Sequence, residues 1–257
     1  MSFCNRIRVI RLVAYGALIV SATLASFFVY RTHFRSAHLR HVLLNSDRWA
    51  SRIRQFENAS GDESATVLLG DSLTRSFPTD LLSRPPYLNW GVGGDFAASL
   101  LLRLEPLEVV KPRIVLLMIG INDIIANESM PTIQDNYRTI VRSIRRHCPD
   151  SKLYVQSCLP TAFHSGMLAD NSQTNQRVIE LNLFLTSLCV EFEADYVDLY
   201  PVFERHGQMR ADTTNDGIHL NTFGYELWAD QVRRQWNTEL GTIGAQRPET
   251  TGSWSSK

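Results

Sequence analysis

The stretch Thr66-Val67-Leu68-Leu69-Gly70-Asp71-Ser72-Leu73 joins an apolar run to a turn and a serine. A short apolar run that ends at a glycine is typical of a strand buried on both faces of a parallel sheet. The serine comes directly after this strand, where a helix is expected to begin. Runs of similar character recur along the chain, and we predict four further strands over residues 87–90, 113–119, 152–156 and 196–198.

Helical patterns separate these strands. We predict helices over residues 96–106, 132–147 and 172–192, and a last helix over 222–236. Regular alternation of strand and helix predicts a parallel sheet covered by helices on both faces, with right-handed crossovers. The expected fold class is therefore α/β, with a three-layer, doubly wound, parallel five-stranded sheet.

Composition limits the range of functions. The chain has 257 residues, with 26 Lys and Arg against 26 Asp and Glu. The charges balance, so the composition does not indicate a nucleic-acid partner. The four cysteines show no CxxC spacing and no Cys/His cluster, so a metal site is not expected, and buried free thiols are the preferred interpretation.

The N-terminal segment differs from the rest. Residues 12–30 carry no charge and are long enough to span a bilayer as a helix, with arginines on both sides. An uncleaved single-pass anchor is favoured over a cleaved signal peptide, because the apolar run continues beyond the candidate cleavage site around Ala25. A buried helix of the globular domain is the third alternative. Export would place the rest of the chain outside the cytoplasm, although the flanking charges do not confirm that orientation.

The expected organisation follows from these patterns. Residues 1–31 form the membrane anchor or signal segment, 32–61 a helical spacer, 62–240 the main domain, and 241–257 a polar, disordered tail. A helix over residues 36–57 is predicted within the spacer. It either packs on the domain, which we prefer, or lies on a membrane surface, since it is basic.

Three polar or glycine-rich segments follow predicted strands. Ser72 follows the first strand, Gly94 the second and Asn122 the third. Because ligands of such sheets bind beyond the carboxyl ends of the strands, these residues should meet at one edge. Among the seven histidines only His219 has an aspartate, Asp216, three residues upstream in a glycine-containing loop. That spacing lets the carboxylate orient the imidazole, which can then accept the proton of a serine hydroxyl.

The blocks Gly70-Asp71-Ser72-Leu73, Gly91-Val92-Gly93-Gly94-Asp95, Gly120-Ile121-Asn122-Asp123 and Asp216-Gly217-Ile218-His219 occur in this order. In these four blocks the chain resembles the SGNH hydrolases, also called the GDSL esterase/lipase family, from about Val67 to about Trp236. The resemblance implies a flavodoxin-like sheet and a catalytic triad of Ser72, Asp216 and His219. It also implies an oxyanion hole formed by the backbone N–H groups of Ser72 and Gly94 and by the Asn122 side chain.

The expected activity is that of a serine esterase on carboxylic esters, of acyl-ester or lysophospholipid type, without metal or cofactor. An O-acyltransferase acting on envelope glycans on the same scaffold is the alternative, and an inactive, membrane-tethered binding module is a third. The substrate is expected to be a small-molecule, lipid or glycan ester. Residues 160–167 and 203–214 are predicted loops at the same edge and are expected to form the substrate walls.

Overall fold

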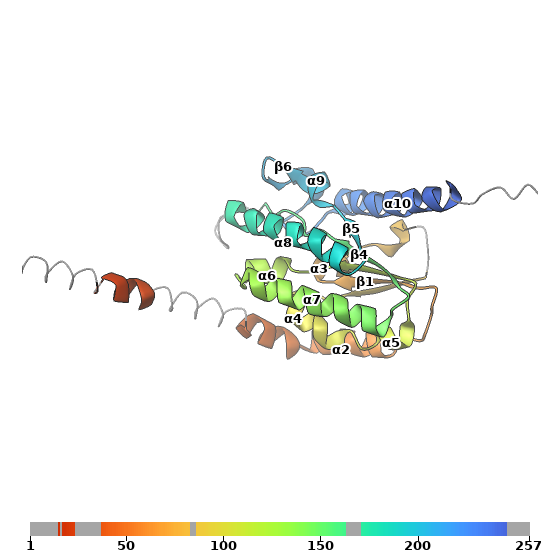
Figure 1. The fold of residues 1–257 in the computed structure, drawn as a ribbon, viewed down its shortest axis with the longest axis horizontal. Helices are drawn as coiled ribbons and strands as arrows, with labels where there is room; N and C mark the ends of the chain where they lie inside the picture. Colours follow the sequence, from red (N-terminus) through yellow and green to blue (C-terminus); the bar gives the residue numbers. More distant parts are fainter. Residues whose placement is uncertain (1–14, 16, 24–36, 83–85, 163–170, 246–257) are drawn as a thin grey trace, which may run out of the picture.

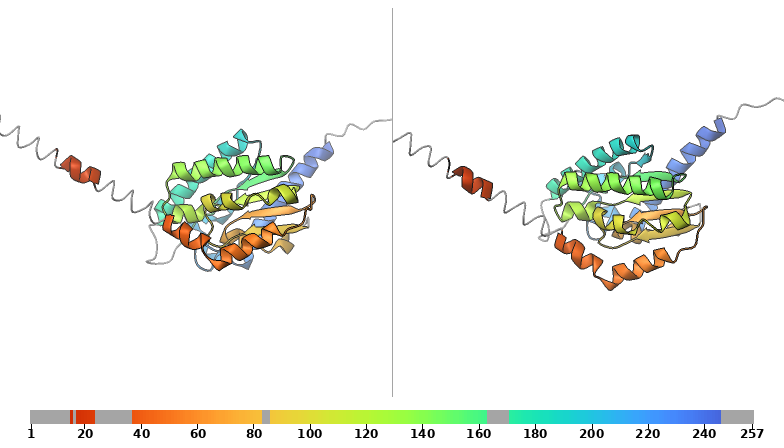
Figure 2. Two further views of the ribbon diagram at one scale, coloured as in Figure 1. Left: turned by 90° about the horizontal axis from the view of Figure 1, so that it is seen from below. Right: turned by 60° about the horizontal axis from the view of Figure 1, so that its bottom comes forward.

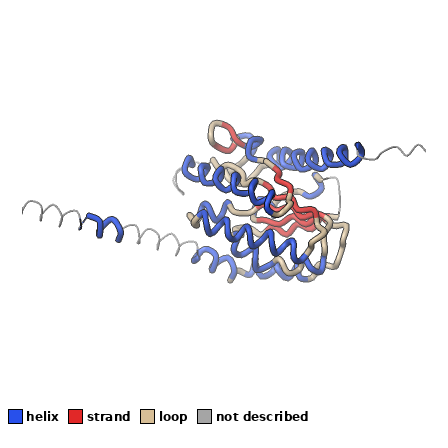
Figure 3. Tube along the Cα trace, viewed as in Figure 1, coloured by secondary structure: helices blue, strands red, loops and turns tan. Residues whose placement is uncertain are grey.

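The structure is a computed structural model that describes residues 15, 17–23, 37–82, 86–162 and 171–245. A five-stranded sheet in the order β2-β1-β3-β4-β5 lies at its centre, and every pair of neighbouring strands is parallel. Its strands are β1 (Thr66–Gly70), β2 (Tyr87–Gly91), β3 (Ile114–Met118), β4 (Lys152–Gln156) and β5 (Asp195–Val197). Helices flank the sheet (Figures 1 and 3), which confirms the predicted parallel α/β architecture.

The helices form two layers. One layer holds α4 (Ala97–Leu100), α5 (Leu107–Val110), α7 (Met130–His147) and α8 (Asn171–Glu191), and α7 contacts the other three. The other layer holds α3 (Ser72–Arg75) and α10 (Thr222–Ala245). These two are joined where Tyr225 donates a hydrogen bond of 3.1 Å to the Leu73 carbonyl oxygen. The remaining elements are short: α6 (Ile121–Ile125), α9 (Tyr200–Phe203), the 3-10 turns η1 (Thr79–Leu81), η2 (Leu101–Arg103) and η3 (Ala211–Thr213), and the hairpin β6 (Glu204–Arg205) with β7 (Gln208–Met209).

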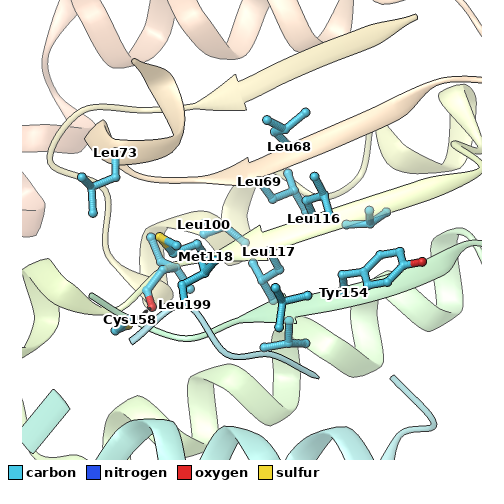
Figure 4. Close-up of a cluster of buried hydrophobic side chains, with 14 of the residues drawn as sticks. Leu68, Leu69, Leu73, Leu100, Leu116, Leu117, Met118, Tyr154, Cys158 and Leu199 are labelled. Atoms are coloured by element: carbon cyan, nitrogen blue, oxygen red, sulfur yellow. Dashed lines mark hydrogen bonds between the residues drawn. The ribbon is translucent and has the colours of Figure 1, made fainter. Parts of the chain in front are cut away.

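The core lies on both faces of the central strands. All five residues of β1 and of β3 are buried, as expected for strands covered by helices on each side. Figure 4 shows leucines from both strands packed together, with Leu100, Leu199 and Cys158 beside them. The three described cysteines, Cys148, Cys158 and Cys189, are buried free thiols.

The register of the sheet brings three chain segments to one level. Gly70 at the end of β1 is paired with Gly91 at the end of β2 and with Met118 at the end of β3. The segments that follow these strands therefore leave the sheet side by side. This is the edge at which the sequence predicts the site.

The predicted helix over 96–106 is broken. The chain forms α4, tightens into the 3-10 turn η2, and starts a separate helix, α5, at Leu107. Pro106 accounts for the break, because a proline cannot donate the backbone hydrogen bond that a continuing helix needs. Asp95 lies just before the observed N-cap, Phe96, and accepts a 3.1 Å hydrogen bond from the Phe96 N–H.

The predicted helix over 36–57 is two helices that meet at an angle, over 37–44 and in α2 (Asp47–Glu57) (Figure 2). Ser46 caps α2 by accepting a hydrogen bond from the Trp49 N–H, which is why the chain turns there. Phe56 on α2 is buried and stacks on Trp90 of β2, with ring centroids 5.2 Å apart. The α2 helix is therefore packed onto the edge of the sheet.

Most of the apolar run over 12–30 lies outside the described residues. In the part of the chain that is described, no helix combines the length and the apolar character needed to cross a bilayer. At the other end, α10 continues past its predicted end at Trp236 to Ala245, and residues 246–257 lie outside the description.

Candidate active site

Ser72 begins α3, immediately after β1. Asp71 caps this helix, and its side chain accepts a 2.9 Å hydrogen bond from the Leu73 N–H. The N–H of Ser72 is at the first helical position, which has no acceptor within its own helix. The Ser72 Oγ lies 2.9 Å from the Nε2 of His219, although 147 residues separate the two in the chain. A hydroxyl at this distance can pass its proton to the imidazole.

His219 is held in the loop that precedes α10. Its Nδ1 lies 2.7 Å from the Oδ2 of Asp216, which fixes Nδ1 as the protonated nitrogen and leaves Nε2 to face Ser72. The other carboxylate oxygen of Asp216 accepts the backbone N–H groups of Ile218 and His219, at 2.9 and 2.7 Å. Burial would raise the pKa of Asp216, but the hydrogen bonds from His219 and Ile218 outweigh it and lower the pKa below its ordinary value. The carboxylate therefore stays ionised beside the imidazole.

Gly94 and Asn122 follow β2 and β3 and line the same cavity as Ser72. Gly94 has a φ of +78°, a conformation that suits glycine and turns the chain between β2 and α4. The Asn122 side chain, at the start of α6, donates a 2.9 Å hydrogen bond from Nδ2 to the Asp95 carbonyl oxygen. This bond uses one of its two N–H groups, and the other has no hydrogen-bond acceptor among the described residues. Ser72, Gly94, Asn122 and His219 all line one cavity of about 970 Å³.

A buried ion pair, Arg103 with Asp95, holds these loops in place. Arg103 is fully buried and pairs with Asp95 at 2.7 Å, and it donates to the carbonyl oxygens of Trp90 and Gly70 at 2.8 and 2.9 Å. One guanidinium thus ties the ends of β1 and β2 to the loop that carries Gly94. Sequence reasoning missed this role because Arg103 falls in a segment predicted to be a regular helix.

Two further buried carboxylates flank the site. Asp71 and Asp123 accept the N–H groups of Leu73 and Ala97, and burial raises the pKa of each to about 7. Each also has one oxygen without a hydrogen-bond partner. They fix the loops around Ser72 and Asn122, while Asp216 is the carboxylate that reaches the imidazole.

The walls of the cavity differ from the predicted ones. Apolar residues from the helix over 37–44 and from α2 form one side, beside Phe96 and Ile125; these residues are Leu39, Val42, Leu43 and Trp49. No described residue of the segments 160–167 and 203–214 lines it, and residues 163–167 lie outside the described part of the chain. Two arginines, Arg52 and Arg75, also reach this cavity and were not singled out from the sequence. The position of Arg75, one turn after Ser72 on α3, is a signal that could have identified it.

Comparison with known proteins identifies the family and agrees with the fold. A profile of the GDSL-like Lipase/Acylhydrolase family matches residues 48–227. The chain is 30% identical over 187 residues to platelet-activating factor acetylhydrolase IB subunit alpha1 of Pongo abelii, which covers 69% of this chain and 78% of the relative. The same subunit of Bos taurus is 29% identical over 215 residues, covering 79% and 90%.

A solved structure shows the same fold. The GDSL-like lipase from Bacteroides thetaiotaomicron superposes with a TM-score of 0.64 at 19% identity, covering 76% of this chain and 98% of that one. The family profile spans well over half of the chain and includes Ser72 and His219. The chain therefore belongs to the GDSL-like lipase/acylhydrolase family and is a hydrolase that acts on esters.

Proposed function

We propose that this chain hydrolyses carboxylic esters of acyl-ester or lysophospholipid type, with Ser72 as the nucleophile, His219 as the general base and Asp216 as the residue that orients the base. One observation carries the proposal. The Ser72 Oγ lies 2.9 Å from the His219 Nε2, and the His219 Nδ1 lies 2.7 Å from the Asp216 Oδ2. The three side chains thus form one hydrogen-bonded chain, and its serine and histidine line a cavity.

The mechanism follows from this geometry. Ser72 attacks the ester carbonyl while its proton passes to the Nε2 of His219, and Asp216 stabilises the resulting imidazolium. The negative charge of the tetrahedral intermediate falls on the former carbonyl oxygen. The N–H groups of Ser72 and Gly94 and the second N–H of Asn122 would bind this oxygen. His219 then gives the proton to the departing alcohol, and a water molecule activated by His219 releases the acid from the acyl-enzyme.

Solvent access favours hydrolysis over acyl transfer. The side chains of His219 and Asp216 have relative solvent exposures of 45% and 52%. Water can therefore reach the proposed base directly. Transfer to a glycan hydroxyl requires water to be excluded while the acyl-enzyme waits for its acceptor. The relatives from Pongo abelii and Bos taurus are named acetylhydrolases, which supports short acyl groups as the preferred substrates here.

The test is a series of p-nitrophenyl esters from acetate to decanoate, assayed with the wild type and with Ser72→Ala. We expect turnover biased to short chains that disappears with Ser72→Ala. Ser187→Ala, which removes an exposed hydroxyl from α8, is the matched control and should retain full activity. Equal rates in wild type and Ser72→Ala would reject the assigned nucleophile.

We also propose that the apolar run over 12–30 attaches the chain to a membrane as a single-pass anchor, with the catalytic domain outside the cytoplasm. The proposal is supported by the length of this segment, which carries no charged residue, and by the arginines on both sides of it. Fractionation of cells that express the whole chain, or a form without residues 1–31, tests this. Recovery of the whole chain in the soluble fraction would refute it.

A further inference from the structure

An arginine that has no partner among the described residues lies next to the proposed nucleophile. Arg75 stands three residues after Ser72 on α3, and residues at this spacing lie on the same side of a helix, about 5–6 Å apart at Cβ. Its side chain lines the cavity that Ser72 and His219 also line. Within the described part of the chain, no carboxylate lies within ion-pair distance of its guanidinium, and no acceptor is hydrogen-bonded to it.

The guanidinium of Arg75 rests on the loop that carries the proposed oxyanion donor. A Cβ added at Gly93 would lie 2.7 Å from the Nη1 of Arg75. The guanidinium therefore packs against the backbone immediately before Gly94. Arg75 is an exposed residue, so its charged group lies in the open part of the cavity and can be reached by a ligand.

A second arginine places another positive charge beside it. Arg52 on α2 lines the same cavity and is held by donating to the carbonyl oxygens of Asn89 and Gly91, at 2.8 and 3.2 Å. Its Nε is buried and has no hydrogen-bond partner. Burial, and then the nearby charges of Arg103 and Arg75, lower the pKa of Arg52. Both arginines line the same cavity, so their positive charges repel each other.

Neither of these two charges is neutralised by the described residues. The third nearby arginine, Arg103, has its own carboxylate in Asp95. Asp47 also lines the cavity, but it forms no ion pair with Arg52 or Arg75. Uncompensated like charges are unfavourable, and their placement beside a reactive centre fits a ligand that brings the opposite charge.

We propose that Arg75, assisted by Arg52, binds an anionic group of the ester substrate, a phosphate or a carboxylate, and so selects esters that carry a negative charge near the scissile bond. A guanidinium suits either group, since its planar N–H donors match two oxygens at once. The apolar residues Leu39, Val42 and Leu43 line the same cavity and would contact the hydrocarbon part. This inference rests on the proposed function, because Ser72 sets the position of the ester.

Two matched substrate pairs test it. The first is 1-butyryl glycerol 3-phosphate against 1-butyryl glycerol, which differ by a phosphate on the alcohol side. The second is monomethyl adipate against methyl hexanoate, which differ by a carboxylate at the end of the acyl chain. For each pair, the ratio of kcat/KM for the anionic ester to kcat/KM for the neutral ester is measured by acid release.

We expect Arg75→Gln to lower this ratio by about tenfold for at least one pair, the effect of losing a hydrogen-bonded charge contact. The affected pair then identifies the anion as phosphate or carboxylate. Arg75→Lys should give a smaller fall, because it keeps the charge and loses the paired donors. Arg54→Gln is the matched control: it removes the same charge from an exposed position of α2 outside the cavity, and should leave the ratio unchanged.

Added salt gives an independent readout. The ratio in the wild type should fall as NaCl rises from about 0.05 to about 0.5 M, and the ratio in Arg75→Gln should change little. Unchanged ratios for both pairs in Arg75→Gln would overturn the anion site while neutral esters are still cleaved through Ser72. Neutral-ester cleavage that survives Ser72→Ala would instead overturn the proposed function.

Discussion

Replacing Arg103 by methionine should destabilise the protein strongly, because it leaves a buried carboxylate without its counter-charge. The side chains of Arg103 and Asp95 are both fully buried, and their N–O distance is 2.7 Å. Removing one member of a buried ion pair costs about 3–5 kcal/mol. The Trp90 and Gly70 carbonyl oxygens also lose a donor, which adds about 1 kcal/mol. The expected loss of roughly 4–6 kcal/mol is a large part of a typical domain stability of about 5–15 kcal/mol.

A double-mutant cycle separates the ion pair from these other contacts. In Arg103→Met with Asp95→Asn no charge is left buried, and the asparagine oxygen can still accept from the Phe96 N–H and the Ser99 hydroxyl. The double variant should therefore lose about 1–3 kcal/mol less than the sum of the two single variants. Arg103→Lys keeps the charge but only some of the donors and should fall between wild type and Arg103→Met, which keeps the test usable if the methionine variant does not fold.

Urea unfolding followed by tryptophan fluorescence measures these differences, since Trp90 lies in the affected strand. Circular dichroism provides a second probe and a check of two-state behaviour. A loss below about 1 kcal/mol in Arg103→Met would refute the reasoning. Strict additivity of the losses in unfolding free energy of Arg103→Met and Asp95→Asn would also refute it. Additivity would mean that the two buried charges do not stabilise each other.

Two further predictions concern the site. Asn122→Ala should lower kcat by about a hundred- to thousandfold, the effect of losing one oxyanion donor, with an unfolding midpoint close to that of the wild type; an unaffected rate would remove Asn122 from the oxyanion hole. Asp71→Asn tests the pKa of about 7 that burial gives this carboxyl. Its raised pKa makes the folded state retain a proton that the unfolded state releases, so wild-type stability should fall as pH rises from about 4 to about 7. The asparagine variant should show a shallower fall and up to about 4 kcal/mol more stability near pH 8 in urea titrations; parallel profiles would contradict the raised pKa.

The strands and the convergence of the candidate site residues could be predicted because their signals are local. The apolar runs of β1 and β3 are buried from end to end, so each pattern indicates a strand without reference to the rest of the chain. Once the sheet is parallel, the ends of β1, β2 and β3 must share an edge, and the residues after them can be expected to meet. The spacing of Asp216 and His219 is equally local, since both belong to one short loop.

The cavity walls and the buried arginine could not be predicted, because they depend on tertiary contacts. The break at Ser46 decides where the helix over 37–44 lies. The packing of Phe56 on Trp90 and the hydrogen bonds of Arg52 to β2 hold α2 on the sheet. Arg103 resembles a surface residue in the sequence. Its burial follows from Asp95 and two strand-end carbonyl oxygens that converge on one point.

The candidate site thus combines exposed polar side chains with a buried layer that fixes them. His219 and Asp216 are about half exposed, so their own contacts contribute little to the stability of the fold. The geometry depends on Arg103, which holds the loop of Asp95, and on the Asp95 carbonyl oxygen, which holds the Asn122 side chain. Substitution of the exposed residues should therefore reduce turnover at nearly constant stability, whereas substitution of Arg103 should reduce both, because the loss of the ion pair also releases the loop that orients Asn122.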